Sequence, residues 1–263
     1  MSPKILKLVF LTVLATQPIL SQTNYRIHYQ LNFQIDSTNS KITDSDIMYL
    51  DVYGNQSSFF QSKSTFLKDS ILRSKNPQSL FSITKPKFNY CIRKDYGTDK
   101  LEAYYDYTTF KFKLIDNVRL NWKITNDTTK DILGYKVKKA SVSFKGRDYT
   151  AWFTDEISIP DGPYKFNGLP GLILEIYDSE KHYHFTAFSL QKIKEHKWYI
   201  VTEDYTSITE KEFNDFQEKI KKKPSLILNN PGIRIPKQGL DKYDRNHKER
   251  NKHKNNPIEI NHL

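Results

Sequence analysis

The chain has 263 residues and a single cysteine, and its 41 Lys and Arg outnumber its 30 Asp and Glu for a formal net charge of +11. One cysteine excludes an intramolecular disulfide framework and a cysteine-rich metal centre, so packing has to supply the stability. The 17 Tyr, 16 Phe and 3 Trp provide apolar surface for a real core. With nine glycines the chain is neither collagen-like nor a glycine-rich linker.

Residues 1–21 predict a signal peptide. Lys4 and Lys7 precede an apolar run from Leu8 to Leu14, and Ser21 offers a small residue for cleavage. The run is too short to span a bilayer. We therefore expect an exported protein of the periplasm, the cell envelope or the secreted medium, and no nucleic acid among its partners.

After this segment, apolar and polar residues alternate strictly along the chain. Apolar residues occupy every second position from Tyr25 to Ile35, with polar residues between them. This alternation predicts a half-buried strand. Further short apolar or alternating runs follow at the spacing of an all-β sheet, barrel or sandwich. We predict that residues 22–229 form a mainly β domain, built as a curved antiparallel sheet or a partly open barrel with one packed α-helix.

That helix is marked at both ends. Thr209 and Glu212 have the spacing of a capping box, and Pro224 ends the segment. Three apolar residues recur at helical spacing and form one stripe: Phe213, Phe216 and Ile220.

The basic charge is concentrated near the C-terminus, since residues 219–254 contain 12 Lys or Arg and three Asp or Glu. Residues 230–263 predict a basic, largely irregular tail. Three roles stay open for it: contact with an anionic membrane surface, contact with an acidic partner, or simple solvation that aids solubility.

The stretch Asn167–Leu174 is the most specific motif of the chain. Its Leu-Pro-Gly-Leu core fits a type II turn, with a positive φ at Gly171. We expect Gly168 to let the backbone pass close to another segment, and the apolar residues that follow to enter a buried strand. The alternative is a surface loop that grips a partner or ligand. Its candidate binding residues are Gly168, Leu169, Pro170, Gly171, Leu172 and Ile173.

In the residues of this motif the chain resembles the GLPGLI family of exported Bacteroidetes proteins. The likeness extends over about residues 122–190 and includes Trp122, Ala151-Trp152-Phe153 and Gly162-Pro163, while Asn256–Glu259 resembles the family's C-terminal pattern. Many members carry a cysteine near the position of Val137, which this chain lacks. The resemblance implies an exported protein of unassigned function and supplies no catalytic residue.

His182 and His184 form a His-x-His pattern. Alternate side chains of a strand share one face, so the two imidazoles could hold one metal ion with a third ligand from Asp178, Glu180 or His28. Exposed strand histidines are the alternative. We predict no cofactor.

Other reactive groups are scattered. Asp155, Glu156 and Asp161 lie in one loop, where paired carboxylates could serve acid–base chemistry or simply be solvated. Cys91 is expected to be a buried, inert thiol. No catalytic residue is assigned on this basis.

Together these features favour an exported cell-envelope protein that binds a ligand or partner without catalysing a reaction. A curved aromatic sheet beneath a helix predicts an apolar concavity, so an apolar small molecule or an outer-membrane protein is the expected partner. One alternative is a metal- or carboxylate-dependent hydrolase of the envelope. Another is a structural interaction module that works through the turn around Gly168 or through the basic tail.

Overall fold

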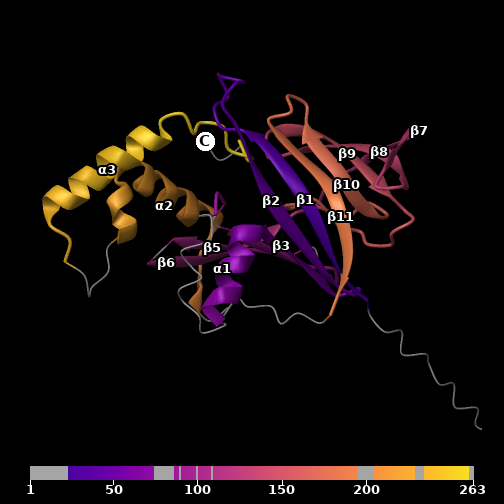
Figure 1. Cartoon of the computed structure of the whole chain (residues 1–263), viewed down its shortest axis with the longest axis horizontal. Helices are drawn as coiled ribbons and strands as arrows, with labels where there is room; N and C mark the ends of the chain where they lie inside the picture. The colour runs from indigo at the N-terminus through magenta and orange to yellow at the C-terminus, as the bar shows by residue number, and fades with distance from the viewer. Residues whose placement is uncertain are drawn as a thin grey trace, which may run out of the picture.

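A single open sheet of 12 strands dominates the fold (Figure 1). The computed structural model describes residues 23–73, 86–88, 90–98, 100–107, 109–194, 204–228 and 234–260; the predicted signal peptide lies outside them. The strands are β1 (Asn24–Gln34), β2 (Thr43–Tyr53), β3 (Ser57–Ser62), β4 (Tyr90–Asp95), β5 (Lys100–Tyr107), β6 (Phe110–Asn117), β7 (Lys123–Ile132), β8 (Tyr135–Phe144), β9 (Arg147–Thr154), β10 (Leu172–Asp178), β11 (Tyr183–Ile193) and β12 (Thr206–Ser207). Their order is β12-β6-β5-β4-β3-β2-β1-β11-β10-β9-β8-β7. All neighbours are antiparallel except the short β12–β6 pair. The predicted mainly β fold is confirmed.

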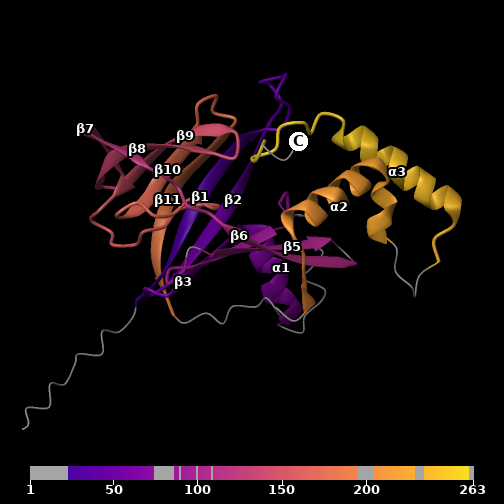
Figure 2. The ribbon, with the colours of Figure 1, turned by 180° about the vertical axis from the view of Figure 1, so that it is seen from behind.

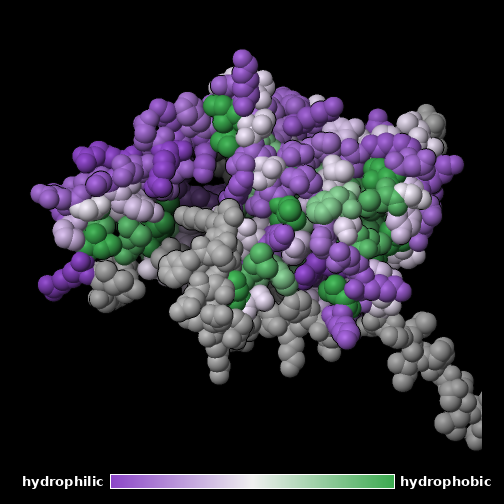
Figure 3. All heavy atoms as spheres, in the orientation of Figure 1, coloured by the Kyte–Doolittle hydropathy of each residue, from purple (hydrophilic) through white to green (hydrophobic). Residues whose placement is uncertain are grey.

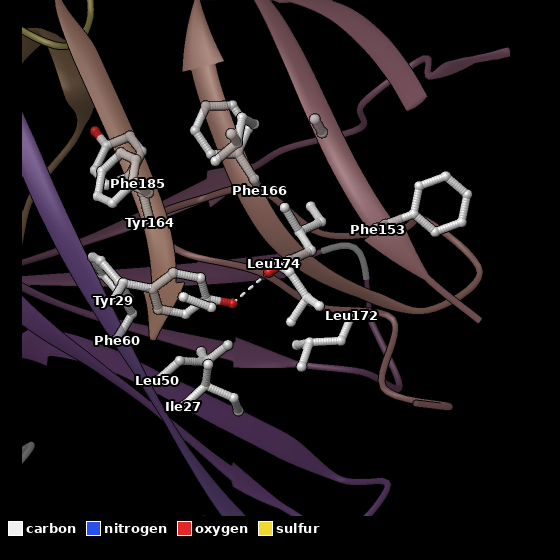
Figure 4. Packing of buried hydrophobic residues seen from close by; sticks show 14 of the residues in the cluster. Ile27, Tyr29, Leu50, Phe60, Phe153, Tyr164, Phe166, Leu172, Leu174 and Phe185 are labelled. Carbon is white, nitrogen blue, oxygen red and sulfur yellow. Dashed lines mark hydrogen bonds between the residues drawn. The ribbon is translucent and has the colours of Figure 1, made fainter. Parts of the chain in front are cut away.

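The alternation of the first strand decides which face of the sheet is buried. Ile27, Tyr29 and Leu31 are fully buried, and most of the residues between and around them are partly exposed. Because side chains of a strand alternate between its two faces, one face of β1 belongs to the core. Figure 4 shows Tyr29 within this core, where its hydroxyl donates to the backbone oxygen of Ile173 at 2.6 Å.

The sheet curls around the loop of residues 155–171, which joins β9 to β10. In the strand order β4 and β9 are far apart, yet the loop contacts both. Its Asp161 forms an ion pair with Lys94 of β4, and its Phe166 ring lies 4.6 Å from the ring of Tyr149 on β9. Figures 1 and 2 show the two halves of the sheet at a steep angle to each other. The curled sheet therefore packs around a loop of the chain itself.

The predicted helix is α2 (Glu210–Lys222). Thr209 and Glu212 form the expected capping box, in which each side chain bonds to the other's backbone N–H. The apolar stripe packs on aromatic residues of the neighbouring strands: the rings of Phe213 and Tyr105 lie 4.2 Å apart, and those of Phe216 and Phe112 lie 4.7 Å apart. Aromatic contact thus fixes α2 at the β5–β6 end of the sheet.

Three further helical segments are present: α1 (Lys63–Arg73), the 3₁₀-helix η3 (Pro224–Leu228) and α3 (Lys237–Asn251). The expectation of a largely irregular tail is corrected by α3. No residue of α3 is buried, and hydrophilic residues cover its visible side in Figure 3. Asp244 tethers α3 to η3, because its carboxylate accepts from both the backbone N–H and the hydroxyl of Ser225. Half-buried residues at helical spacing, among them Leu240, Tyr243 and His247, give α3 one inward face despite its high charge.

Within the described residues, none of the helices has the length and apolar character needed to cross a membrane.

Candidate functional site

The Leu-Pro-Gly-Leu motif belongs to the core. Leu169 is 1% exposed, and Leu172 and Ile173 are fully buried at the start of β10. Gly168 and Pro170 are exposed. This burial favours the structural interpretation of the motif, since only those two positions offer a surface to a partner.

The geometry of the turn corrects two expectations. The Gly171 N–H donates to Leu169 O at 2.8 Å, which closes a three-residue γ-turn on Pro170 in place of the expected type II turn. Gly171 has φ +152°, and a Cβ there would lie 2.0 Å from Thr154 O. The close passage of the backbone is therefore at Gly171. Gly168 has open space around it, and its need for glycine comes from a φ of +86°.

A buried ion pair ties the loop to the opposite half of the sheet. Lys94 is 3% exposed and its partner Asp161 is fully buried. The Lys94 ammonium also donates to Gly162 O at 2.6 Å, and the Tyr96 hydroxyl donates to the second oxygen of Asp161 at 2.6 Å. Burial lowers the pKa of Lys94, and the adjacent carboxylate opposes that shift. Asp161 is thus engaged in holding β4 and the loop together.

The other reactive groups predicted from the sequence are separate from Asp161. Asp155 is exposed and accepts from Lys138 at 2.5 Å, while Glu156 accepts from the backbone N–H of Lys136 at 3.0 Å. The three loop carboxylates are therefore not gathered into one site. Cys91 is buried, and burial raises its pKa well above the ordinary value, as expected for an inert thiol.

Residues Asn256–Ile260, called the strap here, dock onto the sheet and the loop. At its start, Arg147 donates to the Asn256 side chain at 2.5 Å and to Pro257 O at 2.8 Å, and Tyr183 OH donates to Asn256 O at 2.6 Å. Arg147 is itself paired with buried Asp178 at 2.9 Å. From the sequence, these residues were only part of a family pattern with no partner assigned to them.

At the other end of the strap, Glu259 accepts from Tyr164 OH at 2.5 Å and pairs with Lys165 at 2.6 Å. Lys165 also pairs with Asp116 of β6 at 3.0 Å. Burial opposes the charge of Lys165, but its two carboxylate partners outweigh burial and raise its pKa. Tyr164 adopts a φ of +53°, which is strained for a bulky residue, and its contact with Glu259 helps to hold it there.

The two histidines of the His-x-His pattern have different partners. His182 Nδ1 lies 3.2 Å from both Arg147 Nη1 and Glu180 Oε2, whereas His184 Nε2 lies 2.8 Å from Glu175 Oε1. Across the described ranges, no group of three His, Cys, Asp or Glu is placed to hold a metal ion. The structure thus separates His182, which contacts the arginine of the strap site, from His184, which joins another cluster.

That second cluster lies on the outer face of the sheet, away from the core. On β10 and β11 partly exposed residues alternate with buried ones, and the register sets Glu175 opposite Thr186 and Tyr177 opposite His184. Trp152 of β9 is the partner of Glu175 on its other side. We call the following residues the outer-face cluster: Lys130, Trp152, Glu175, Tyr177, His184 and Thr186.

Glu175 is the centre of the outer-face cluster. One carboxylate oxygen contacts His184 Nε2, and the other forms an ion pair with Lys130. Thr186 Oγ1 lies 3.2 Å from the same nitrogen of His184. The side chains of Glu175, His184 and Lys130 are 12%, 30% and 38% exposed, so the cluster is in contact with solvent.

Aromatic rings flank these polar groups. The Lys130 ammonium lies 4.4 Å from the centre of the Trp152 ring, and the Tyr177 and His184 rings meet edge to face at 5.2 Å. Trp152 is 7% exposed, and its buried indole N–H finds no hydrogen-bond acceptor in the part of the chain that the structure describes. A buried, unpaired donor of this kind calls for an explanation.

The electrostatics keep Glu175 ionised. Partial burial would raise its pKa, but hydrogen bonds from His184 and Lys130 outweigh burial and hold the pKa of Glu175 below its ordinary value. The carboxylate is thus a fixed acceptor. Of these three residues only His184 was predicted from the sequence. The strand alternation around Glu175 was a local signal for Glu175, whereas Lys130 lies on a different strand.

The family model described as "N-glycanase peptide, N-terminal domain" matches residues 32–215, well over half of the chain. The chain belongs to this family. This match does not test the resemblance to the GLPGLI family, which stays a prediction.

Two solved structures align with the fold of this chain. Two crystal forms of PNGF-II, in space groups P21 and C2, align at TM-scores of 0.56 and 0.55 with 18% and 17% identity, and each alignment covers 76% of this chain. The chain spans about a third of the length of these proteins, 34% and 33%. No curated protein matches the sequence.

Proposed function

We propose that the chain is an exported, non-catalytic binding module that recognises a glycoprotein. The family description names an N-glycanase peptide, and the chain corresponds to a third of the solved PNGF-II structures. We take recognition of the glycoprotein as the task of this part of such a protein. Export rests on the prediction from residues 1–21.

The outer-face cluster is the observation that carries the proposal. It combines an ionised carboxylate, an imidazole, a hydroxyl and aromatic rings, all on rigid strands and partly open to solvent. Polar groups fixed on strands suit binding because they lose little conformational entropy when a ligand binds. The interior charges have a different role: Lys94 with Asp161, and Lys165 with Glu259, each join separate parts of the chain.

Binding and product formation test the proposal in one experiment. The full chain is passed over an immobilised glycoprotein in a biosensor, and the same glycoprotein is analysed by mass spectrometry after long incubation with the chain. We expect saturable binding and an unchanged mass. The absence of binding would overturn the proposal, and a mass loss that tracks the amount of chain would replace it with catalysis.

A carboxylate-dependent hydrolase is the second candidate, and one contact favours it. His184 Nε2 lies 2.8 Å from Glu175 Oε1, which is the arrangement of a base and the group that orients it. In that case His184→Ala would abolish the mass loss in the experiment above, while a Glu218→Gln control on exposed α2 would not.

Contact between the basic tail and an anionic membrane surface stays a prediction. Lys242, Arg245 and Lys248 are exposed on α3 and compatible with it.

A further inference from the structure

We propose that the outer-face cluster binds the carbohydrate part of a glycoprotein rather than its polypeptide. This inference rests on the binding function proposed above and adds to it the site and the chemical class of the ligand.

The backbone around the cluster argues against a peptide. A peptide commonly binds a sheet by adding a strand to a free edge, where unpaired N–H and C=O groups await it. Here β10 lies between β9 and β11, and β11 lies between β10 and β1. The cluster therefore presents side chains on the face of a sheet, and the ladders beneath it are already paired.

The polar groups instead match a ligand that carries many hydroxyls. A hydroxyl both donates and accepts, so it needs acceptors and donors side by side. Glu175 supplies a charged acceptor. Because its Oε1 accepts from His184 Nε2, that nitrogen cannot accept from the Thr186 hydroxyl 3.2 Å away, and the hydroxyl proton is left for a ligand. Lys130 compensates the charge of Glu175, so this pair selects for hydroxyls rather than for an ion.

Trp152 adds the second, independent observation. Its side chain is more than nine-tenths buried, and its indole N–H has no acceptor among the described residues. The Lys130 ammonium lies over the ring at 4.4 Å and is itself 38% exposed. If the Lys130 ammonium keeps its pair with Glu175 but moves off the ring, C–H groups of a ligand gain the ring face, and a ligand oxygen beside them can accept from the unpaired indole N–H. A sugar ring offers both kinds of group at once.

Three probes test the inference in the biosensor: a ribonuclease carrying an N-linked oligomannose glycan, the same protein after enzymatic removal of the glycan, and the released free glycan. We expect the full chain to bind the first and third probes and to ignore the second. Glu175→Gln should weaken binding by about tenfold or more, because it removes a charged acceptor. Glu218→Gln, on exposed α2, is the matched control and should bind as the unaltered chain does.

A ¹⁵N NMR titration with the free glycan provides a readout that does not depend on a variant. The indole N–H signal of Trp152 should shift on binding. Trp122 is the internal control, because its indole N–H already donates to Asn167 O at 2.8 Å and its signal should stay in place.

The possible failures are distinguishable. If no probe binds, the proposed function fails and this inference falls with it. If the two ribonuclease forms bind equally, the polypeptide is the ligand, and the inference is overturned while the binding function stands. If the glycan binds but Glu175→Gln has no effect and the Trp152 signal does not move, the sugar binds elsewhere and the assignment of the cluster is overturned.

Discussion

Substituting the two glycines of the Leu-Pro-Gly-Leu motif by alanine separates two reasons for glycine. At Gly171 a Cβ would meet Thr154 O at 2.0 Å and Thr154 C at 2.6 Å, whereas ordinary contact begins at 3.4 Å. The obstacle is backbone, so β9 and the start of β10 have to separate at the Leu172–Thr154 pair. At Gly168 nothing lies within 4 Å of the added Cβ, and only its φ of +86° opposes a side chain.

The expected costs follow from these geometries. Losing about two ladder hydrogen bonds at about 1 kcal/mol each, with about 1–3 kcal/mol of overpacking, lowers the free energy of unfolding of Gly171→Ala by about 3–5 kcal/mol. Gly168→Ala should lower it by about 1–2 kcal/mol, the cost of a left-handed conformation for a residue with a Cβ.

Urea denaturation followed by tryptophan fluorescence measures both variants against the unaltered chain. Since typical proteins are stable by only about 5–15 kcal/mol, the larger loss is easily seen. A Gly171→Ala variant as stable as Gly168→Ala would refute the argument that backbone contact with Thr154 requires glycine.

Three further predictions concern the anchors of the fold. Lys94→Met leaves the buried Asp161 carboxylate without its cation and should lower the free energy of unfolding by about 3–5 kcal/mol; a loss below about 1 kcal/mol in urea would contradict a structural role for the pair. Thr209→Ala removes one side of the capping box and should cost about 1 kcal/mol, with Thr206→Ala in the adjacent β12 as the control in thermal melts. Hydrogen bonds from Thr38 above all, and from Asn255 just before the strap, lower the pKa of Asp36. A lowered carboxylate pKa stabilises the fold above about pH 4 and loses that effect as the pH falls further, so the melting temperature should drop less between pH 5 and pH 2.5 in Asp36→Asn; an equal drop would show that Asp36 does not contribute.

Much of the local structure could be predicted from the sequence. The alternation from Tyr25 to Ile35 identified β1 and its buried face, and the Thr209–Glu212 spacing identified α2 with its cap. These features depend on residues close together in the chain, where the period of a strand or helix and the chemistry of a cap act directly. The predicted type II turn at Pro170 was wrong, and no pattern within the turn indicated that the Gly171 backbone passes against Thr154.

The candidate site could be predicted only in part. His184 stood out as one half of a pattern, but its partner proved to be Glu175 rather than His182. Lys130 and Trp152 come from other strands, and only the order and register of the sheet bring them to the same place. The apolar–polar periodicity within one strand does not indicate which residues of another strand will lie beside it.

The amino-acid sequence by itself determined the class of fold, the faces of individual strands and the ends of α2, because those follow from short-range periodicity and hydrogen bonding. Only the tertiary structure decided that Lys94 meets Asp161 within a curled sheet, that the strap docks on Arg147, and that an ionised Glu175 faces solvent among aromatic rings. Those contacts join residues far apart in the chain, so they form only once the whole sheet has curled around its loop, which also removes Lys94 and Asp161 from water.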